Sequence, residues 1–190
     1  MVDHLTYYYL SDREPFQSIS ALPDKEAIRI MKSLCDESRF GSRFKEPEQY
    51  LINRRETEKW LYDGFVEKGG KPQNTYPISM VLGSSKWLVA NMPDPAKHAE
   101  IHIPLSQFSE QDVSFTYPDS MISRWFDFEK PAELYQPDLH GQVFTLSEIL
   151  VLVNERGMPE EDWVLNGPEH LASYIEAQVW NHEVLKSFVS

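Results

Sequence analysis

The chain has 190 residues, of which 41% are hydrophobic and 13% aromatic, and it contains one cysteine. That length suits a single domain with a substantial core, and one cysteine excludes both an intramolecular disulfide and a zinc site made of cysteines. The formal net charge of −12 belongs to residues 92–190, because residues 1–91 carry 13 basic and 13 acidic side chains. Nucleic acid and anionic membranes repel an acidic protein, so neither is expected as a partner.

No signal-like segment opens the sequence, and no apolar run approaches the ~18 residues needed to span a bilayer. We therefore expect a cytoplasmic protein without membrane contact. Cys35 is expected to be a small buried hydrophobe near a helix end. His98 and His102 have the spacing of helical metal ligands, but their segment reads as a loop followed by a strand, so no metal site is predicted.

In the first half of the chain, residues 4–10 ("HLTYYYL") are β-branched and aromatic without Gly or Pro, which predicts a strand. Residues 20–35 have Pro23 in the first turn and an apolar stripe, which predicts a helix. A longer helix is predicted over 47–68, started by Pro47 and ended by glycines. Its apolar stripe is interrupted by Arg54 and Glu58, so Arg54 is either paired internally or reserved for an anion.

In the second half, strands are predicted at 77–83, 100–104, 112–117 and 174–180, and a helix at 145–157. Thr145 and Glu148 have the spacing of a capping box for that helix, and Gly157 fits its C-terminal cap. Met121–Gly141 holds several prolines and acidic residues, so we expect an irregular excursion of the kind that forms lids or binding loops.

No internal repeat, low-complexity tract or linker divides the sequence, so residues 1–190 are expected to form one domain. Helices and strands do not alternate regularly. This order predicts an α+β fold with a mixed or mostly antiparallel sheet and N-terminal helices packed on it.

The most informative stretch is "YIEAQVW", residues 174–180, where strand periodicity puts Ile175, Ala177 and Val179 on one face. The other face then carries a carboxylate and an amide, Glu176 and Gln178, between two large rings, Tyr174 and Trp180. This face is either the outer surface of a sheet or the floor of a polar pocket. A half-covered Glu176 would have a raised pKa unless a donor bonds it.

Two further stretches carry candidate ligand contacts. "FTYPDS" ends a strand with Thr116, Tyr117, Asp119 and Ser120. This stretch is either ordinary turn chemistry or a rim that offers a hydroxyl, a ring and a carboxylate to a ligand. A cluster of cations in residues 39–55 is either paired with nearby glutamates on a helix surface or forms an anion site. The members of this cluster are Arg39, Arg43, Lys45, Arg54 and Arg55.

Two resemblances add to these observations. The segments "SFTYPDSM", "GQVFTLSEIL" and "GPEHLASYIEAQVW" resemble a group of uncharacterised bacterial cytoplasmic proteins, and that likeness implies no function. "TYYYLS" and "YIEAQVW" are similar to two elements of the ADP-ribosyltransferase fold, including its DarT-like branch: an early strand beside the nicotinamide ribose and a late strand with a catalytic glutamate. Tyr8 stands where that fold has its histidine, and Leu10 where it has a hydroxyl residue.

The second resemblance implies an enzyme that uses NAD, with Glu176 as the catalytic carboxylate and Gln178 and Tyr8 beside it. Tyr7 and Tyr9 would contact the nicotinamide end, and Arg39, Arg43 or Arg54 would meet the diphosphate, because planar bidentate donors suit phosphate oxygens. Tyr117, Asp119 and Trp180 complete the candidate ligand-binding set.

The competing interpretation is a non-catalytic module that binds a small molecule or a basic protein surface and needs no cofactor. The high ring content, the lack of a complete catalytic set and the long excursion favour it, and from the sequence it is the leading hypothesis. The two interpretations differ in one geometric expectation. The enzyme needs Glu176 at the base of a concave pocket with residues 4–10 and 39–55 converging on it, whereas the module predicts a shallow surface there.

Overall fold

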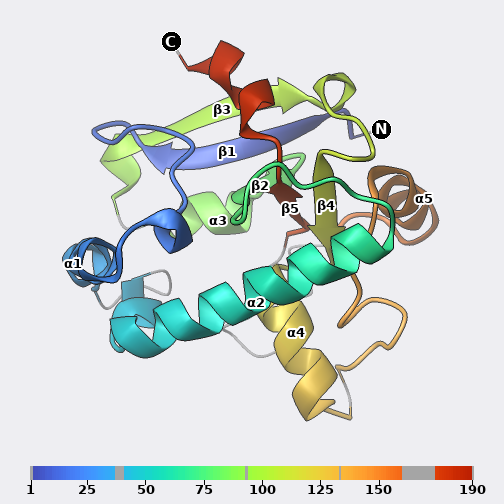
Figure 1. Cartoon of the computed structure of the whole chain (residues 1–190), viewed down its shortest axis with the longest axis horizontal. Helices are drawn as coiled ribbons and strands as arrows, with labels where there is room; N and C mark the ends of the chain where they lie inside the picture. Colours follow the sequence, from blue (N-terminus) through green and yellow to red (C-terminus); the bar gives the residue numbers. More distant parts are fainter. Residues whose placement is uncertain (1, 37–40, 93, 133, 160–173, 190) are drawn as a thin grey trace.

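The computed structural model describes residues 2–36, 41–92, 94–132, 134–159 and 174–189. Its α-helices and strands alternate irregularly along the chain, with short 3-10 turns (η) between them (Figure 1). The elements in chain order are β1 His4–Leu10, η1 Ile19–Ala21, α1 Asp24–Leu34, η2 Gly41–Phe44, α2 Pro47–Glu67, β2 Ile78–Leu82, α3 Lys86–Ala90, η3 Pro95–Lys97, β3 His98–Pro104, η4 Leu105–Gln107, β4 Val113–Thr116, α4 Ser120–Glu129, α5 Leu146–Arg156, β5 Glu176–Val179 and η5 His182–Phe188.

Within the described residues, the strands form one five-stranded sheet in the order β3-β1-β2-β5-β4, and each neighbouring pair is antiparallel. The α+β class and the mostly antiparallel sheet are therefore confirmed. The first and last strands are not adjacent, because β2 lies between β1 and β5 and pairs with both. Side chains of β1 and β5 that share a face are thus separated by one strand.

One face of the sheet is apolar and holds the main core. The pairs Leu5↔Leu82 and Met80↔Ala177 place these residues on a common face, where all four are buried. Ile149 of α5 and Leu185 of η5 belong to the same buried cluster, so these elements cover the apolar face. This is the alternation that the sequence of residues 174–180 predicts.

The opposite face is lined with polar residues and is covered by α2, which runs across the sheet in Figure 1. Leu61 and Phe65 of α2 pack against Trp180, whose ring is stacked on Phe65 with the centroids 6.1 Å apart. The buried residues of α1 instead pack against α2 and η2. The expectation that N-terminal helices pack on the sheet therefore holds for α2, whereas α1 forms a second cluster with α2.

Two expectations are wrong, one of them in part. The first part of Met121–Gly141 is not irregular, because α4 occupies Ser120–Glu129 and is capped at its N-terminus by the Asp119 side chain. Residues 130–132 and 134–141 contain turns and neither helix nor strand, as the sequence predicts. Cys35 is exposed rather than buried, since α1 ends just before it and the chain turns extended there. The capping box of Thr145 and Glu148 is confirmed at the start of α5.

None of the described helices is long and apolar enough to cross a membrane.

Candidate functional site

The polar face of β5 is buried beneath α2. Glu176, Gln178 and Trp180 expose 3%, 0% and 0% of their surface. The interpretation of this face as the outer surface of a sheet is therefore wrong, and its polar groups must find partners inside the protein because unpaired buried polar groups are costly. Glu176 and Gln178 meet this requirement in different ways.

Gln178 is satisfied by side chains of the neighbouring strand β4. Its carbonyl oxygen accepts a hydrogen bond from Ser114 Oγ at 2.9 Å, and its amide nitrogen donates to Thr116 Oγ1 at 3.3 Å. Ser114 Oγ in turn accepts a hydrogen bond from the Trp180 indole at 2.9 Å. These residues form a closed structural network that fixes β5 against β4.

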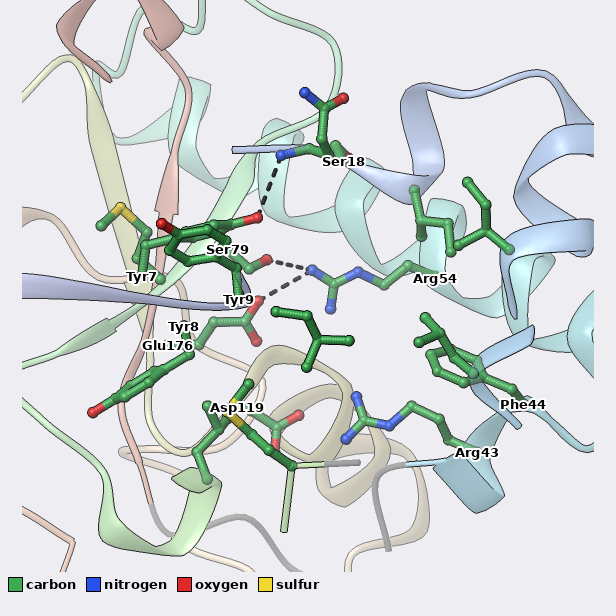
Figure 2. Close-up of a pocket in the computed structure, with 18 of the residues that line it drawn as sticks. Tyr7, Tyr8, Tyr9, Ser18, Arg43, Phe44, Arg54, Ser79, Asp119 and Glu176 are labelled. Carbon is green, nitrogen blue, oxygen red and sulfur yellow. Dashed lines mark hydrogen bonds and ion pairs between the residues drawn. The ribbon is translucent and has the colours of Figure 1, made fainter. Parts of the chain in front are cut away.

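Glu176 is instead paired with Arg54, which reaches the sheet from α2. Arg54 Nη2 lies 3.1 Å from Glu176 Oε1 and donates to Ser79 Oγ of β2 at 2.6 Å, as Figure 2 shows. Its Nε donates to Glu58 Oε1, one helical turn along α2, at 2.8 Å. Side-chain exposures of 12% for Arg54, 2% for Glu58 and 4% for Glu176 make this a buried ion cluster. The question of whether Arg54 is paired internally or reserved for an anion is settled in favour of internal pairing.

The start of α4 completes the coordination of Glu176. The backbone N–H and the hydroxyl of Ser120 each donate to Glu176 Oε2 at 2.7 Å. Burial alone would raise the pKa of Glu176, but the Arg54 guanidinium and the Ser120 hydrogen bonds outweigh burial and hold the pKa below its ordinary value. Glu176 is therefore a carboxylate at neutral pH, and both of its oxygens accept hydrogen bonds.

Asp119, the residue before Ser120, is in a different environment. Its Oδ1 accepts hydrogen bonds from the backbone N–H groups of Met121 and Ile122, which is the N-cap arrangement. Its Oδ2 is buried and accepts no hydrogen bond from any described residue. Burial, followed by repulsion from Glu176, raises the pKa of Asp119 from 3.8 to about 6. The turn interpretation of "PDS" is correct in its chemistry, although the turn is the first turn of a helix.

These charged groups line a cavity of about 1030 Å³. Pockets that hold small organic molecules and cofactors usually have volumes of this order, lined by aromatic and apolar side chains around a few polar groups. Elements from across the fold contribute: β1 and the loop after it, η1, α1, η2, α2, β2, α3, the start of α4, Tyr174 and the first residue of β5. The charged lining residues are Arg13, Glu14, Glu26, Arg29, Arg43, Arg54, Glu58, Asp119 and Glu176.

Aromatic rings form part of the same wall. Tyr7, Tyr8 and Tyr9 of β1 line the cavity together with Tyr50 and Tyr174. The Tyr8 hydroxyl accepts a hydrogen bond from Ser85 N at 2.9 Å, which fixes the ring against the N-cap of α3. Burial raises the pKa of Tyr7 and, more strongly, that of Tyr174, so both phenols are neutral at physiological pH.

The structure brings together most of the side chains that the sequence singled out. Glu176, Asp119, Arg43, Arg54 and the three tyrosines of β1 all line the cavity. Figure 2 shows the four charged side chains turned toward one another from β5, η2, α2 and the N-cap of α4. Tyr7 also packs against the apolar core of the other face. Gln178 and Trp180 lie outside its lining, in the network with Ser114, and Tyr117 packs on the apolar core of the other face. Arg39 lies outside the described residues.

Two residues of the site, Glu58 and Ser79, were not predicted as site residues from the sequence, and both bind Arg54. Ser120 and Tyr174 were noted in the sequence, and the structure gives them partners and places: Ser120 binds Glu176, and Tyr174 adds a ring to the wall. The spacing of Arg54 and Glu58 by four residues is a signal for their contact. Ser79 is the only hydroxyl residue in the apolar strand "ISMVL", which is a weaker signal.

Among the described residues, no group of three or more His, Cys, Asp and Glu side chains is arranged to hold a metal ion. His98 and His102 lie on one face of the edge strand β3 with Glu100 between them, and their Nε2 atoms are 3.7 Å and 3.2 Å from its carboxylate oxygens.

No protein-family model matches the chain, and neither a curated protein nor a solved structure matches it.

Proposed function

We propose that this chain is an NAD-dependent ADP-ribosyltransferase-like enzyme whose reaction takes place in the cavity beside Glu176. One observation carries the proposal: Glu176 lines a cavity of about 1030 Å³ together with Tyr7, Tyr8 and Tyr9. This is the concave geometry that the enzyme interpretation requires and the shallow-surface interpretation does not. The likeness of "TYYYLS" and "YIEAQVW" to the strands of that fold agrees with it.

The charge state of Glu176 suits the chemistry. Breaking the bond between nicotinamide and ribose develops positive charge on the sugar, and a fixed carboxylate in a water-poor site stabilises that charge. Arg54 and Ser120 hold Glu176 in one position and keep it ionised, as its lowered pKa indicates. Preorganisation of this kind means that little rearrangement is needed when the charge appears.

The remaining lining residues suit the other parts of NAD. The tyrosines of β1 provide ring surfaces for the nicotinamide end. The diphosphate needs cations, and Arg54 is already bonded to Glu58 and Glu176. We therefore assign the diphosphate to the arginines of the lining that come from outside α2, such as Arg13 and Arg29, instead of to Arg54.

The second candidate is a domain that binds a small molecule in the same cavity and catalyses nothing. The internal pairing of Arg54 favours this candidate, because a structural ion cluster at the base of a pocket needs no reaction to explain it. A basic protein surface as partner stays a prediction that depends on the acidic second half of the chain.

Calorimetric titration with NAD and an assay of nicotinamide release separate these candidates. We expect wild type to bind NAD at sub-millimolar concentration and to release nicotinamide. Glu176→Gln should lower the release rate by about 100-fold, the scale of losing one electrostatic stabiliser, and leave the affinity for NAD within about threefold. Glu155→Gln, an exposed glutamate of α5, is the matched control and should change neither quantity.

Lack of binding at millimolar NAD would refute the NAD-dependent function. If the protein binds NAD but neither releases nicotinamide nor transfers ADP-ribose to an acceptor, the non-catalytic candidate is favoured. A Glu176→Gln variant as active as wild type would place the chemistry at another residue.

A further inference from the structure

The Asp119 carboxylate has an oxygen that the fold leaves without a partner. Asp119 exposes 7% of its surface, and Oδ2 accepts no hydrogen bond from the described part of the chain. A buried polar atom without a partner costs free energy, and in a native protein it calls for an explanation such as a catalytic role. Asp119 also lines the cavity, and Figure 2 shows its carboxylate between Glu176 and Arg43.

Glu176 and Asp119 differ in what they can do with a proton. Three hydrogen bonds to its oxygens and a lowered pKa make Glu176 a weak base. Asp119 has a free acceptor position on Oδ2, and its raised pKa lies close to the working pH, where a general base is most effective. Two carboxylates whose environments push their pKa values apart are typical of a divided role in catalysis.

We infer that Asp119, and not Glu176, accepts the proton of the group that attacks the ribose. This inference rests on the proposed NAD-dependent function. It also defines the acceptor class: the attacking group carries an O–H or N–H that points at Asp119 Oδ2. Glu176 keeps the single task of stabilising positive charge on the sugar.

The step balances with water as the simplest acceptor. A lone pair of the attacking oxygen forms a bond to the anomeric carbon of the ribose, while the bond from that carbon to the nicotinamide ring breaks. Its electron pair goes to the positively charged ring nitrogen, so nicotinamide leaves as a neutral molecule. The proton of the attacking O–H moves to Asp119 Oδ2. No oxidant, reductant or metal is needed.

The pH dependence of this step follows from the groups that face Asp119. Glu176 of β5 repels its charge, Arg43 of η2 and Arg54 of α2 attract it, and Tyr174 beside it is neutral at physiological pH. Glu176 is already ionised above its lowered pKa, and the arginines stay charged throughout. The ionisation of Asp119 therefore gives the acidic limb of the rate, with a midpoint near its pKa of about 6.

The test uses the full chain, NAD as the probe, and nicotinamide release into water measured from pH 4.5 to 8.5. We expect the wild-type rate to rise with pH and level off above neutrality. Asp119→Asn keeps the N-cap, because Asn is as good a cap as Asp. It should lower kcat by about 100-fold, the usual scale of a general base, and remove the acidic limb, while NAD affinity stays within about threefold.

A second variant and a control keep the outcome clear. Asp119→Ser also retains a capping oxygen and should show the same loss. Asp112→Asn, the same change at the start of β4 and outside the cavity lining, should keep wild-type kinetics. If Asp119→Asn retains the wild-type rate within threefold and the same acidic limb while Glu176→Gln is inactive, the inference is overturned and the proposed function survives. If wild type neither binds NAD nor releases nicotinamide, both are overturned.

Discussion

Replacing Asp119 with asparagine should stabilise the protein, although the same change should lower its activity by about 100-fold. The pKa of Asp119 is raised from 3.8 to about 6 in the folded state, chiefly by burial. The protonated carboxyl group of Asp119 is therefore better accommodated in the folded state than the carboxylate. Its contribution to the free energy of unfolding is fully present below pH 3.8 and is lost as pH rises through about 6. Ionising a group with this pKa difference costs the folded state about 3 kcal/mol at pH 7.5, and about 1 kcal/mol at pH 4.5.

Asparagine has no charge to bury and retains the capping oxygen, so Asp119→Asn removes this cost. We expect the free energy of unfolding to increase by up to about 3 kcal/mol at pH 7.5 and by about 1 kcal/mol at pH 4.5. Urea unfolding followed by tryptophan fluorescence at both pH values measures the difference. A gain in stability that does not depend on pH, or a loss of stability at pH 7.5, would show that burial does not raise the pKa of Asp119.

Asp112 provides a control, because its pKa is shifted in the direction opposite to that of Asp119. Its carboxylate accepts hydrogen bonds from Ser109 and Asn181, which outweigh its partial burial and lower its pKa. The stability that Asp112 contributes is present above its unfolded pKa and is lost as pH falls. Asp112→Asn should therefore destabilise the protein at pH 7.5, where Asp119→Asn stabilises it.

Three further predictions test the buried polar groups. Arg54→Lys should lower the free energy of unfolding by about 3 kcal/mol, because a single ammonium cannot bridge the buried carboxylates, whereas Arg55→Lys, on the more exposed neighbour, should cost about 1 kcal/mol in the same urea titration. Ser114→Ala leaves the Trp180 indole N–H unpaired and should cost about 1–3 kcal/mol, measured by thermal unfolding; a neutral result would contradict the closed network. Burial lowers the pKa of His140 from 6.5 to about 4, so its stabilising effect is present above pH 6.5 and lost toward pH 4, and His140→Gln should flatten the loss of stability between these values.

The sequence predicts the elements whose signals are local. The capping box at Thr145 is confirmed because its two partners are three residues apart and act within a single turn. Helix α2 is confirmed with its start at Pro47, and the faces of β5 follow from strand alternation alone. These features depend on neighbours along the chain, and the sequence contains that information.

The pairing of Arg54 with Glu176 could not be predicted in this way. The two residues are 122 positions apart, and their contact requires that β5 lie beside β2 and that α2 cross the polar face above them. The pattern of α2 shows that Arg54 and Glu58 interrupt an apolar stripe, which indicates burial. It does not show which strand supplies the other carboxylate, because strand order is a property of the whole sheet.

The helix at Ser120–Glu129 was not predicted, for a physical reason that also bears on the site. A side-chain oxygen of Asp after Pro accepts hydrogen bonds from nearby backbone N–H groups both in a turn and at a helix N-cap, so "PDS" fits either. In this protein Asp119 is the N-cap of α4, and the first turn of the same helix presents the Ser120 N–H to Glu176. Since Asp119 caps the helix that holds Glu176 in place, displacing α4 would disturb both carboxylates together. Conservative changes that retain the cap, such as Asp119→Asn, are therefore the ones that can separate a proton-accepting role from a structural one.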